Sequence, residues 1–477
     1  MYKDKLNRYL IPLGLTLALA SCKIPEITQI AENKSVPASY GIDADTTNTS
    51  TGDWHSFFTD KNLVSLIDTA LKNNQELKIT LQEIEIAKND IQVRKGDLLP
   101  TVGLKAGAGL EKVGRYTSQG AGDASTEIAP GKEFPDPLAD FTVGAYANWE
   151  VDIWKKLRSA KKAALTRYLS TVEGRNFVLT NLIAEVANSY YELQALDNQL
   201  VIIKENIGLQ KNAMEIVQVQ KEAARATELG VQKFQAEVLK SQSLEFEIMQ
   251  KIKETENRIN FLLGRYPQEI VRETGDFLSM NPALVHTGIP SQLLANRPDI
   301  KQAELDLAAA KLDVKVARAE FYPSFDISAG VGFQAFKTSY LFRTPESLLY
   351  SLAGDLVAPL INRNAIKAEF KSANARQLQA MYNYERTILN AYLEVSTGLS
   401  GISNLEKSYD LKAKQVDALN KSIEVSNDLF KSARADYFEV LMTQRDALEA
   451  KLELIETKRD QLNAVTTIYR NIGGGWK

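Results

Sequence analysis

Cysteine and histidine are scarce in this sequence of 477 residues, which contains only Cys22, His55 and His286. This scarcity excludes disulfides within one chain, zinc fingers and clusters of cysteine and histidine metal ligands. A basic excess is also missing, because 57 lysines and arginines stand against 60 acidic residues, so no nucleic-acid partner is expected. After residue 22, no apolar run approaches the roughly 18 residues of a transmembrane helix.

Motifs for catalysis are missing too. The chain has no phosphate-binding P-loop, no His-Glu-x-x-His zinc motif and no Gly-x-Ser-x-Gly nucleophile motif. His55 and His286 are therefore expected to have packing or surface roles rather than to bind a metal. We expect no enzyme activity, no cofactor and no resident metal.

Proline is absent from residues 138–266 and 360–477, which permits long helices there. In each interval apolar residues recur every seven positions, and such a repeat produces a left-handed coiled coil. The two series are Leu165, Val172, Leu179, Val186, Leu193, Leu200, Ile207 and Met214, and Met381, Ile388, Val395, Ile402, Tyr409, Val416, Ile423 and Phe430. We expect helical hairpins at about 155–263 and 362–472. An ordinary bundle core explains the stripes, but not a helix about 100 Å long, which residues 155–222 would form at about 1.5 Å per residue.

The single cysteine follows an N-terminal targeting pattern. Basic residues among the first nine precede an apolar stretch over residues 10–20, which predicts a secretory signal peptide at residues 1–21. The sequence Leu19-Ala20-Ser21-Cys22 resembles a bacterial lipobox, in which the cysteine is acylated. Cys22 is therefore expected to carry a lipid that includes palmitate. The alternative is an ordinary signal peptide with a chance cysteine.

The remainder of the chain is a tandem duplication. Residues 73–109 resemble residues 296–332 at an offset of 223, and further matches follow in the same order in both halves. They include Asn188 on Asn390, Tyr190 on Tyr392, and Ala224 on Ala433. We expect a lipidated linker, rich in Thr, Ser, Asn and Asp, over residues 22–60, a first repeat over 61–290 and a second over 291–477.

Each repeat contains two segments in which apolar and polar residues alternate. They lie at about 101–112 and 141–153 in the first repeat, and at about 324–336 and 347–360 in the second. Alternation over about ten residues predicts a strand with one apolar face, and that length also spans a membrane. A soluble sandwich would give the same pattern. The polar face of the first segment carries small and charged residues, which favours a lumen; they are Gly103, Lys105, Gly107 and Gly109.

Four membrane strands cannot close a barrel by themselves, and a bilayer tolerates no open sheet edge, so the chain is expected to oligomerise. Two copies would supply 8 strands and three copies 12, and only the larger barrel leaves room for a pore. The helices are too polar for the bilayer and should continue from it as a coiled-coil tube. Shorter helices are expected at about 61–95 and 296–320, just before a strand in each repeat.

Several motifs resemble the signature of the outer-membrane efflux factors, the TolC-like family. The most specific is Ile289-Pro-Ser-Gln-Leu-Leu-Ala-Asn-Arg-Pro-Asp-Ile300, followed by Gln302-Ala-Glu304 and Val316-Ala-Arg-Ala-Glu-Phe-Tyr-Pro-Ser324. Phe261-Leu-Leu-Gly-Arg-Tyr-Pro267 and Gly473-Gly-Gly-Trp476 match as well. The resemblance covers essentially the whole chain after the signal peptide and is greatest to the lipoprotein branch similar to OprM and NodT.

This resemblance implies an α+β membrane protein in which three chains share one 12-stranded β-barrel that continues into a long α-helical periplasmic tunnel. It implies a mixed equatorial domain built from residues 23–60, 264–295 and the C-terminal end. It also implies a passive exit channel in the outer membrane, working in a tripartite pump. The partners would be a periplasmic adaptor and an inner-membrane transporter of the RND type.

The resemblance also assigns roles to the hairpin ends. A periplasmic gate is expected at Asp436, Glu439 and Met442, with the two carboxylates forming part of an acidic ring. Relatives often carry aspartate at the position of Met442, so an apolar constriction is the alternative there, and solvation of a helix face is the alternative for the carboxylates. Adaptor docking is expected at the two tips, which include Arg225, Gly230, Val231, Arg434 and Val440.

A rival interpretation is a structural coiled-coil lipoprotein that spans the periplasm. The four alternating segments argue against it, because a spacer needs no strands. The substrate is not fixed by the sequence. Six methionines and two histidines provide no methionine-rich metal relay, which favours drugs, amphiphiles or dyes over copper or silver.

Overall fold

The computed structural model describes residues 25–27, 31–41, 46–273, 275, 277–359, 363–432 and 434–476. This part of the chain forms two compact units. The first unit contains the described residues up to 31 together with residues 86–168 and 305–381, and the second contains residues 32–85, 169–304 and those from 382 onward. Among the described helices, none combines the length and the apolar composition needed to cross a membrane.

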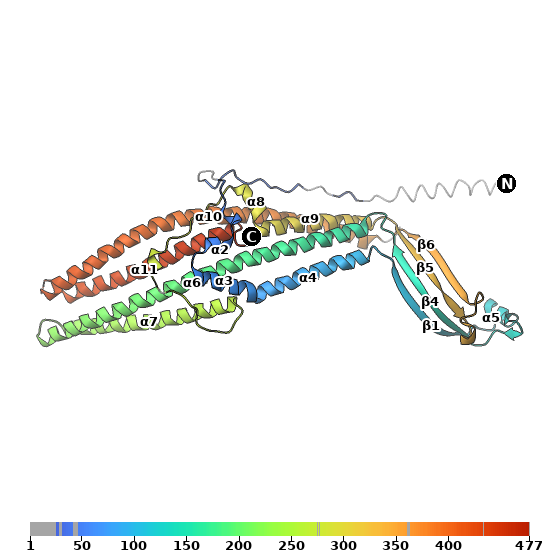
Figure 1. The fold of residues 1–477 in the computed structure, drawn as a ribbon, viewed down its shortest axis with the longest axis horizontal. Helices are drawn as coiled ribbons and strands as arrows, with labels where there is room; N and C mark the ends of the chain where they lie inside the picture. The colour runs from blue at the N-terminus through green and yellow to red at the C-terminus, as the bar shows by residue number, and fades with distance from the viewer. Residues whose placement is uncertain are drawn as a thin grey trace. The chain divides into compact units, whose positions relative to one another are not determined.

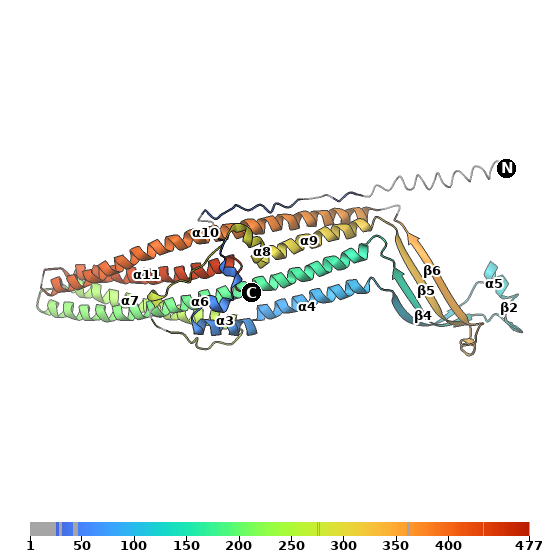
Figure 2. The same ribbon diagram turned by 45° about the horizontal axis from the view of Figure 1, so that its top comes forward.

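The first unit contains an antiparallel sheet of four strands in the order β1–β4–β5–β6. The strands are β1 (Thr101–Glu111), β4 (Leu138–Glu150), β5 (Ser324–Ala335) and β6 (Leu348–Val357), and they lie side by side in Figures 1 and 2. Strands from the two repeats meet where β4 pairs with β5. Within the described residues, β1 and β6 each leave one edge without a partner.

The register places most apolar residues of the four strands on one face, and Leu349 and Val357 of β6 lie on the other. Leu104 lies opposite Ala145, Ala145 lies opposite Val331, and Val331 lies opposite Tyr350. Because side chains alternate along a strand, the same pairing continues every second residue. In a single chain this face is largely uncovered, since Leu104 is 88% exposed.

The opposite face carries most of the glycines of the sheet. Gly103 lies opposite Tyr146, and a Cβ atom added at Gly103 would stand 2.6 Å from the Tyr146 ring. Gly144 pairs with Gly332, and a Cβ atom added at Gly332 would lie 2.5 Å from the carbonyl oxygen of Val143. The glycines on this face therefore allow a neighbouring ring and backbone to come close.

The connection between β1 and β4 contains more regular structure than its glycines and prolines predict. It holds α5 (Ser118–Asp123) and a small hairpin of β2 (Glu127–Ala129) and β3 (Lys132–Glu133). Lys132 donates a hydrogen bond to the Tyr340 hydroxyl at 3.0 Å, which joins this hairpin to η4 (Thr338–Tyr340). The two connections at this end of the sheet are thus tied to each other.

Long helices form two antiparallel hairpins, each visible in both ribbon views. The first pairs α6 (Lys156–Glu222) with α7 (Glu228–Leu262), and the second pairs α10 (Asn364–Lys431) with α11 (Tyr437–Asn471). The seven-residue series predicted from the sequence point inward. All of their members are buried or half-buried except Leu165, which is exposed.

Shorter helices complete the two repeats. The helix expected at about 61–95 is broken in two, α3 (Lys61–Asn73) and α4 (Gln75–Gly96). Asn74 causes the break, because its side chain accepts a hydrogen bond from the amide of Leu77 at 3.0 Å and donates one to the carbonyl of Leu262 at 2.9 Å. The corresponding elements of the second repeat are η3 (Pro290–Gln292), α8 (Leu293–Asn296) and α9 (Pro298–Ala319), with η2 (Phe277–Ser279) ahead of them.

The end of the segment expected to be a linker belongs to the core of the second unit. It contains η1 (Thr49–Thr51) and α2 (Trp54–Phe57), and both Trp54 and Phe58 are buried in a cluster with Tyr190 and Tyr469. A linker reaching residue 60 is therefore wrong. The prediction relied on the polar composition of the segment and overlooked Trp54 and Phe58.

The duplication is also visible in how the returning helices end. After α7, Gly264 has a φ of 66°, and an added Cβ atom would lie 2.6 Å from the carbonyl oxygen of Asn73. After α11, Gly473 has a φ of 87°, and its added Cβ atom would lie 2.6 Å from the carbonyl oxygen of Asn296. The matching asparagines thus meet matching left-handed glycines, where no other residue fits without strain.

Candidate functional site

The two hairpin tips are closed by the same backbone hydrogen bond. In the first tip, the amide of Arg225 donates to the carbonyl of Gln220 at 2.8 Å, and in the second the amide of Arg434 donates to the carbonyl of Leu429 at 2.8 Å. Bonds between residues five apart satisfy the carbonyls that a helix end leaves free. Ala224 adopts a φ of 55° to make this turn.

Each returning helix then begins at a capping side chain. Thr227 accepts a hydrogen bond from the amide of Gly230 at 3.3 Å, and Asp436 accepts one from the amide of Phe438 at 3.5 Å. Ser, Thr, Asp and Asn are favoured at this position because they satisfy a free helical amide. Thr227 and Asp436 therefore determine where the returning helix of each hairpin begins.

An apolar cluster, here called the tip core, joins the two tips. Its buried members are Ala213 and Val217 of α6, Phe234 of α7, Phe430 of α10, and Val440 and Leu441 of α11. Gly230 lies against the ring of Tyr437, because an added Cβ atom would stand 3.2 Å from that ring. The Lys233 ammonium also lies 4.8 Å from the centre of the Phe438 ring. The tips of both hairpins therefore form one packed structure.

The predicted docking residues fall into two groups. Arg225 and Arg434 are exposed, whereas Gly230 and Val440 are buried and Val231 is half-buried against the tip core. In a single chain, only the two arginines are presented outward. The other three shape the tips on which those arginines stand.

The predicted gate residues lie on the first turns of α11. Asp436 and Glu439 are exposed, and Met442 is half-buried. Both carboxylates stand at the N-terminal end of the helix, where the helix dipole favours negative charge. The first tip carries an acidic residue at a different position, Glu228, which is paired with Lys221, and the hydrogen bond from that lysine lowers the pKa of Glu228.

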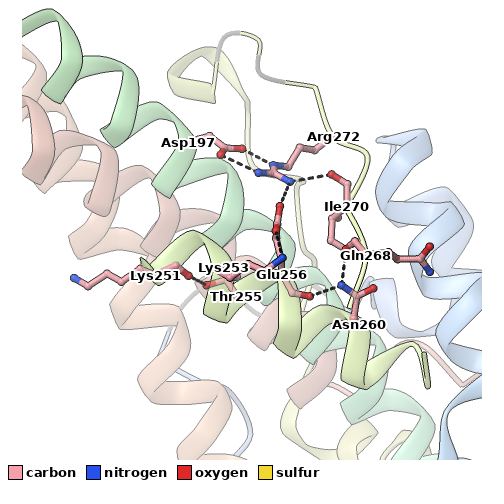
Figure 3. A network of polar contacts seen from close by, with 9 residues as sticks. All are labelled: Asp197, Lys251, Lys253, Thr255, Glu256, Asn260, Gln268, Ile270 and Arg272. Carbon is pink, nitrogen blue, oxygen red and sulfur yellow. Dashed lines mark hydrogen bonds and ion pairs between the residues drawn. The ribbon is translucent and has the colours of Figure 1, made fainter. Parts of the chain in front are cut away.

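A polar network ties the segment after α7 to the coiled coil (Figure 3). Arg272 donates to both carboxylate oxygens of Asp197, at 2.5 and 3.0 Å, and to Glu256 at 2.8 Å. Burial opposes its charge, but the hydrogen bonds to Asp197 and Glu256 outweigh burial and hold the pKa of Arg272 above its ordinary value. Beside it, Asn260 donates to the carbonyl of Gln268 at 2.7 Å.

The same segment reaches the second hairpin. Phe277 is buried in a cluster with Ala195 of α6 and with Ile455 and Leu462 of α11. The carbonyl of Leu278 accepts a hydrogen bond from the Tyr409 hydroxyl of α10 at 3.0 Å. Residues 265–273 and 277–280, here called the girdle segment, therefore contact all four helices.

A second buried arginine serves the other repeat. Arg297 is 5% exposed; it donates two hydrogen bonds to Asp299, at 3.0 and 2.6 Å, and one to Glu394 at 2.7 Å. It also donates to the carbonyl of Asn471 at 3.0 Å, which joins the start of α9 to the end of α11. Burial opposes the charge of Arg297, yet the bonds to Asp299 and Glu394 raise its pKa.

Sequence reasoning missed both arginine networks. Arg272 lies in a stretch without periodicity, and its partners Glu256 and Asp197 are on two different helices, 16 and 75 residues away in the chain. Arg297 lies in the most specific motif of the sequence, directly before Pro298. A charged residue at the start of a helix in such a motif was the available signal, but the partners Glu394 and Asn471 follow only from the fold.

Comparison with known proteins identifies the family. The model of the family described as outer membrane efflux protein matches residues 66–265 and 289–474. The chain belongs to this family. The two matched stretches follow the same order as the two repeats.

Relatives cover most of this efflux protein. It is 28% identical to the pyoverdine export outer membrane protein OpmQ of Pseudomonas aeruginosa, over 89% of this chain and 87% of the relative. It is 25% identical to the cation efflux system protein CusC of Escherichia coli O6:H1, over 98% and 99% of the two chains. It is 26% identical to the probable outer membrane lipoprotein SilC of Salmonella typhimurium, over 89% and 88%.

The fold also matches a solved channel. The crystal structure of the open state of the Neisseria gonorrhoeae MtrE outer membrane channel superposes with a TM-score of 0.82 at 22% identity, covering 95% of this chain and 98% of that one. The predicted fold class is confirmed in the chain itself, whose described residues form a four-stranded sheet and two long helical hairpins. The efflux protein is an outer-membrane exit channel. Cys22, the predicted lipid site, lies outside the described residues.

Proposed function

We propose that this efflux protein is the lipid-anchored outer-membrane duct of a tripartite pump. Three copies form one channel, and a periplasmic adaptor and an inner-membrane transporter of the RND type supply it with substrate. The observation that carries the proposal is the four-stranded sheet with two free edges in a chain of this family. Its parts, from assembly to substrate, rest on separate features of the chain.

Assembly follows from the edges and the apolar face of the sheet. An unpaired strand edge is unstable in a bilayer, because its amides and carbonyls find no water there. Pairing β6 of one copy with β1 of the next removes every edge once the ring closes. Three copies would give 12 strands, with the exposed face around Leu104 and Leu352 toward lipid and the glycine-rich face toward the lumen.

Within each copy we propose a first repeat over residues 61–290 and a second over 291–477. A lipid on Cys22 would hold the N-terminus at the membrane. The described part of the following segment lies along the second unit, since the amide of Asn33 donates to Glu385 at 2.9 Å and Lys34 donates to Glu304 at 2.6 Å. Tyr40 stacks on Tyr392 with ring centres 5.5 Å apart.

Asp436 and Glu439 are proposed to form an acidic ring that restricts the closed channel, with Met442 one turn further along α11. Three copies of each carboxylate around one axis would attract cations and repel one another. Asp436 also caps α11, so the variant must keep the cap. Asp436→Asn with Glu439→Gln removes the charges while preserving both hydrogen-bonding shapes.

The charge-removal variant is expected to lose much of the cation selectivity of the channel and to raise its single-channel conductance in planar bilayers severalfold. Glu228→Gln, in the first tip, is the matched control, because Lys221 already neutralises that carboxylate. Unchanged conductance and selectivity in the double variant would remove the gate from the proposal.

The exposed arginines Arg225 and Arg434 are proposed to lie in the adaptor-docking surface, on tips shaped by Gly230, Val231 and Val440. The experiment is cross-linking in cells from Arg225→Cys and Arg434→Cys, with Lys112→Cys, in the connection after β1, as the control. Capture of an adaptor from the tips and not from the control supports docking. Capture from all three positions or from none contradicts it.

An organic amphiphile is proposed as the substrate class. The chain has six methionines and two histidines, and the described residues contain no group of three or more His, Cys, Asp or Glu side chains that could hold a metal. Relatives of similar identity are named for pyoverdine export and for cation efflux. Efflux of a dye from cells that carry the whole pump, with silver resistance measured in parallel, separates the two classes.

A further inference from the structure

We infer that a buried polar layer divides the coiled coil of the second unit and acts as the pivot on which the hairpin tips swing when the channel opens. The polar layer consists of Asn206 and Gln210 of α6, Ser241 of α7 and Gln444 of α11. The mechanical meaning of this inference rests on the proposed function, but the layer itself is tested independently below.

Gln210, Ser241 and Gln444 of the polar layer lie between two apolar clusters, and Asn206 lies one turn before Gln210, next to Ile207 of the second of these clusters. On one side is the tip core. On the other side is a second cluster whose buried members are Leu196, Ile203 and Ile207 of α6, Ile248 of α7 and Leu448 of α11. The same three helices, α6, α7 and α11, contribute to both clusters, so their order along each helix defines what lies between them.

Along each helix a polar residue separates the members of the two clusters. On α6, Gln210 follows Ile207 and precedes Ala213. On α11, Gln444 lies between Leu441 and Leu448, and on α7 Ser241 lies between Phe234 and Ile248. At this level each of the three helices therefore has a polar residue, whereas the clusters on either side are built from apolar residues.

The residues of the polar layer are buried, and several of their polar atoms have no partner. Gln210, Ser241 and Gln444 are 0%, 2% and 3% exposed. Within the described part of the chain, neither amide atom of Gln210 makes a hydrogen bond, and the same holds for Oε1 of Gln444 and Nδ2 of Asn206. Buried amides of this kind are almost always hydrogen-bonded, so three together mark an exception that needs a cause.

The cost of these unpaired groups lowers the local stability of the coiled coil at the level of the layer. A polar group buried without a partner destabilises the packed state, whereas the apolar clusters on either side stabilise it. Segments with the lowest local stability are the ones that open first, and they open as units. The tip core on one side of the layer is such a unit.

A fixed point lies on the opposite side of the layer. The girdle segment holds α6 at Asp197, next to Leu196 at the far end of the second cluster, and α11 at Ile455, beyond Leu448. The girdle segment fixes the helices at one level, the polar layer is less stable, and the tip core moves as a packed unit. Together these three features give the geometry of a hinge. A groove of about 510 Å³ opens at the level of the polar layer between α7 and α11, lined in part by Ser241, Leu244, Arg445 and Leu448.

The groove explains how opening would be compensated. When the tips swing, water entering from the groove can donate to and accept from the freed amides of Gln210 and Gln444. The amides stay unpaired while the layer is packed, and a swing of the tips hydrates them. The layer lowers the difference in free energy between the two states without weakening the packing on either side.

The test replaces the amides with apolar side chains of similar size, in Gln210→Met with Gln444→Met. Hydrogen exchange of the full-length protein in detergent is measured by mass spectrometry. Amides on the tip side, in residues 211–219 and 438–443, should exchange about tenfold more slowly, as expected when a buried unpaired group is removed. Amides in residues 198–205, between the layer and the girdle segment, should change by less than about twofold.

Single variants and a control keep the test decisive. Gln444→Met alone should slow the tip side by roughly threefold, and Gln235→Met, at an exposed position of α7, should change neither side. Equal slowing on both sides of the layer, or no slowing, would overturn the inference.

Planar-bilayer recording of the same double variant connects the layer to gating. Its channel should open less often than wild type at equal conductance. A wild-type protein that forms no channel contradicts the proposed function. A wild-type channel with an unchanged opening frequency in the variant contradicts only the pivot.

Discussion

The two helical hairpins, α6–α7 and α10–α11, have the same backbone structure at their helix ends. The side chains around those ends differ. Each tip closes with a bond between residues five apart, and each returning helix ends at a left-handed glycine packed on an asparagine carbonyl. The acidic residues differ. Glu228 of the first tip is neutralised by a lysine, whereas Asp436 and Glu439 of the second stand exposed.

This difference shows which properties a duplicated chain keeps. Steric devices persist in both copies, because each hairpin must reverse and dock in the same way. Charge is free to diverge, because the reversal does not depend on it, and the proposed gate lies in the second hairpin only. The predictions below test whether the two copies respond equally where the devices match, and unequally where the chemistry differs.

The largest effect is expected from the buried arginines, one for each repeat. Arg297→Met and Arg272→Met each leave carboxylates without their cationic partner. For buried pairs this typically lowers the free energy of unfolding by about 3–5 kcal/mol. The loss of stability should be larger for Arg297, because its side chain is 6% exposed while the Arg272 side chain is 13% exposed. Thermal unfolding followed by circular dichroism measures both. A larger loss in Arg272→Met would reverse the ranking of the two repeats.

A smaller and equal effect is expected from the matched glycines. Gly264→Ala and Gly473→Ala each place a Cβ atom 2.6 Å from a carbonyl oxygen at a positive φ, which costs about 1–3 kcal/mol. Gly208→Ala is the control, because it is helical with no atom within 4 Å of its added Cβ, and alanine should be neutral or stabilising there. Losses that differ strongly between Gly264 and Gly473 would show that the two helix ends are not equivalent.

The smallest effect is expected from a pair in the segment that precedes the first repeat. His55 contacts Asp53 through Nδ1 at 2.8 Å, and this hydrogen bond raises the pKa of His55 and lowers the pKa of Asp53. The histidine contribution is fully present below the unfolded pKa of about 6.5 and is lost as the pH rises through the higher folded value. The aspartate contribution is lost as the pH falls below about 4.

Comparing wild type with His55→Ala by thermal unfolding should therefore show a larger difference at pH 5.5 than at pH 9. His55 also stacks on Trp54 with ring centres 3.7 Å apart, and the charged imidazole interacts more strongly with the indole, which adds to the difference at low pH. A difference that does not change with pH would mean that the pair contributes no charge-dependent stability.

Periodic features of the fold could be predicted from the sequence, and single contacts could not. The seven-residue series and the alternating segments led to the hairpins and strands, because burial on one face repeats along an element. The break at Asn74 was missed, since one capping side chain interrupts an otherwise helical pattern. Trp54 and Phe58 were missed because a polar neighbourhood surrounds them.

The candidate site shows the same division. The tips were found through matching residues in the two repeats, but the burial of Gly230 and Val440 depends on the tip core, which four helices build together. Arg272, Arg297 and the polar layer follow only from contacts between residues far apart in the chain. Their partners have no fixed spacing that a sequence pattern could reveal.

The central claim is that three copies of this efflux protein enclose one channel. Purified full-length protein should have three times the mass of one chain by native mass spectrometry, and the same preparation should give discrete single-channel currents in planar bilayers. A monomer or dimer, or a trimer that never conducts, would contradict the account.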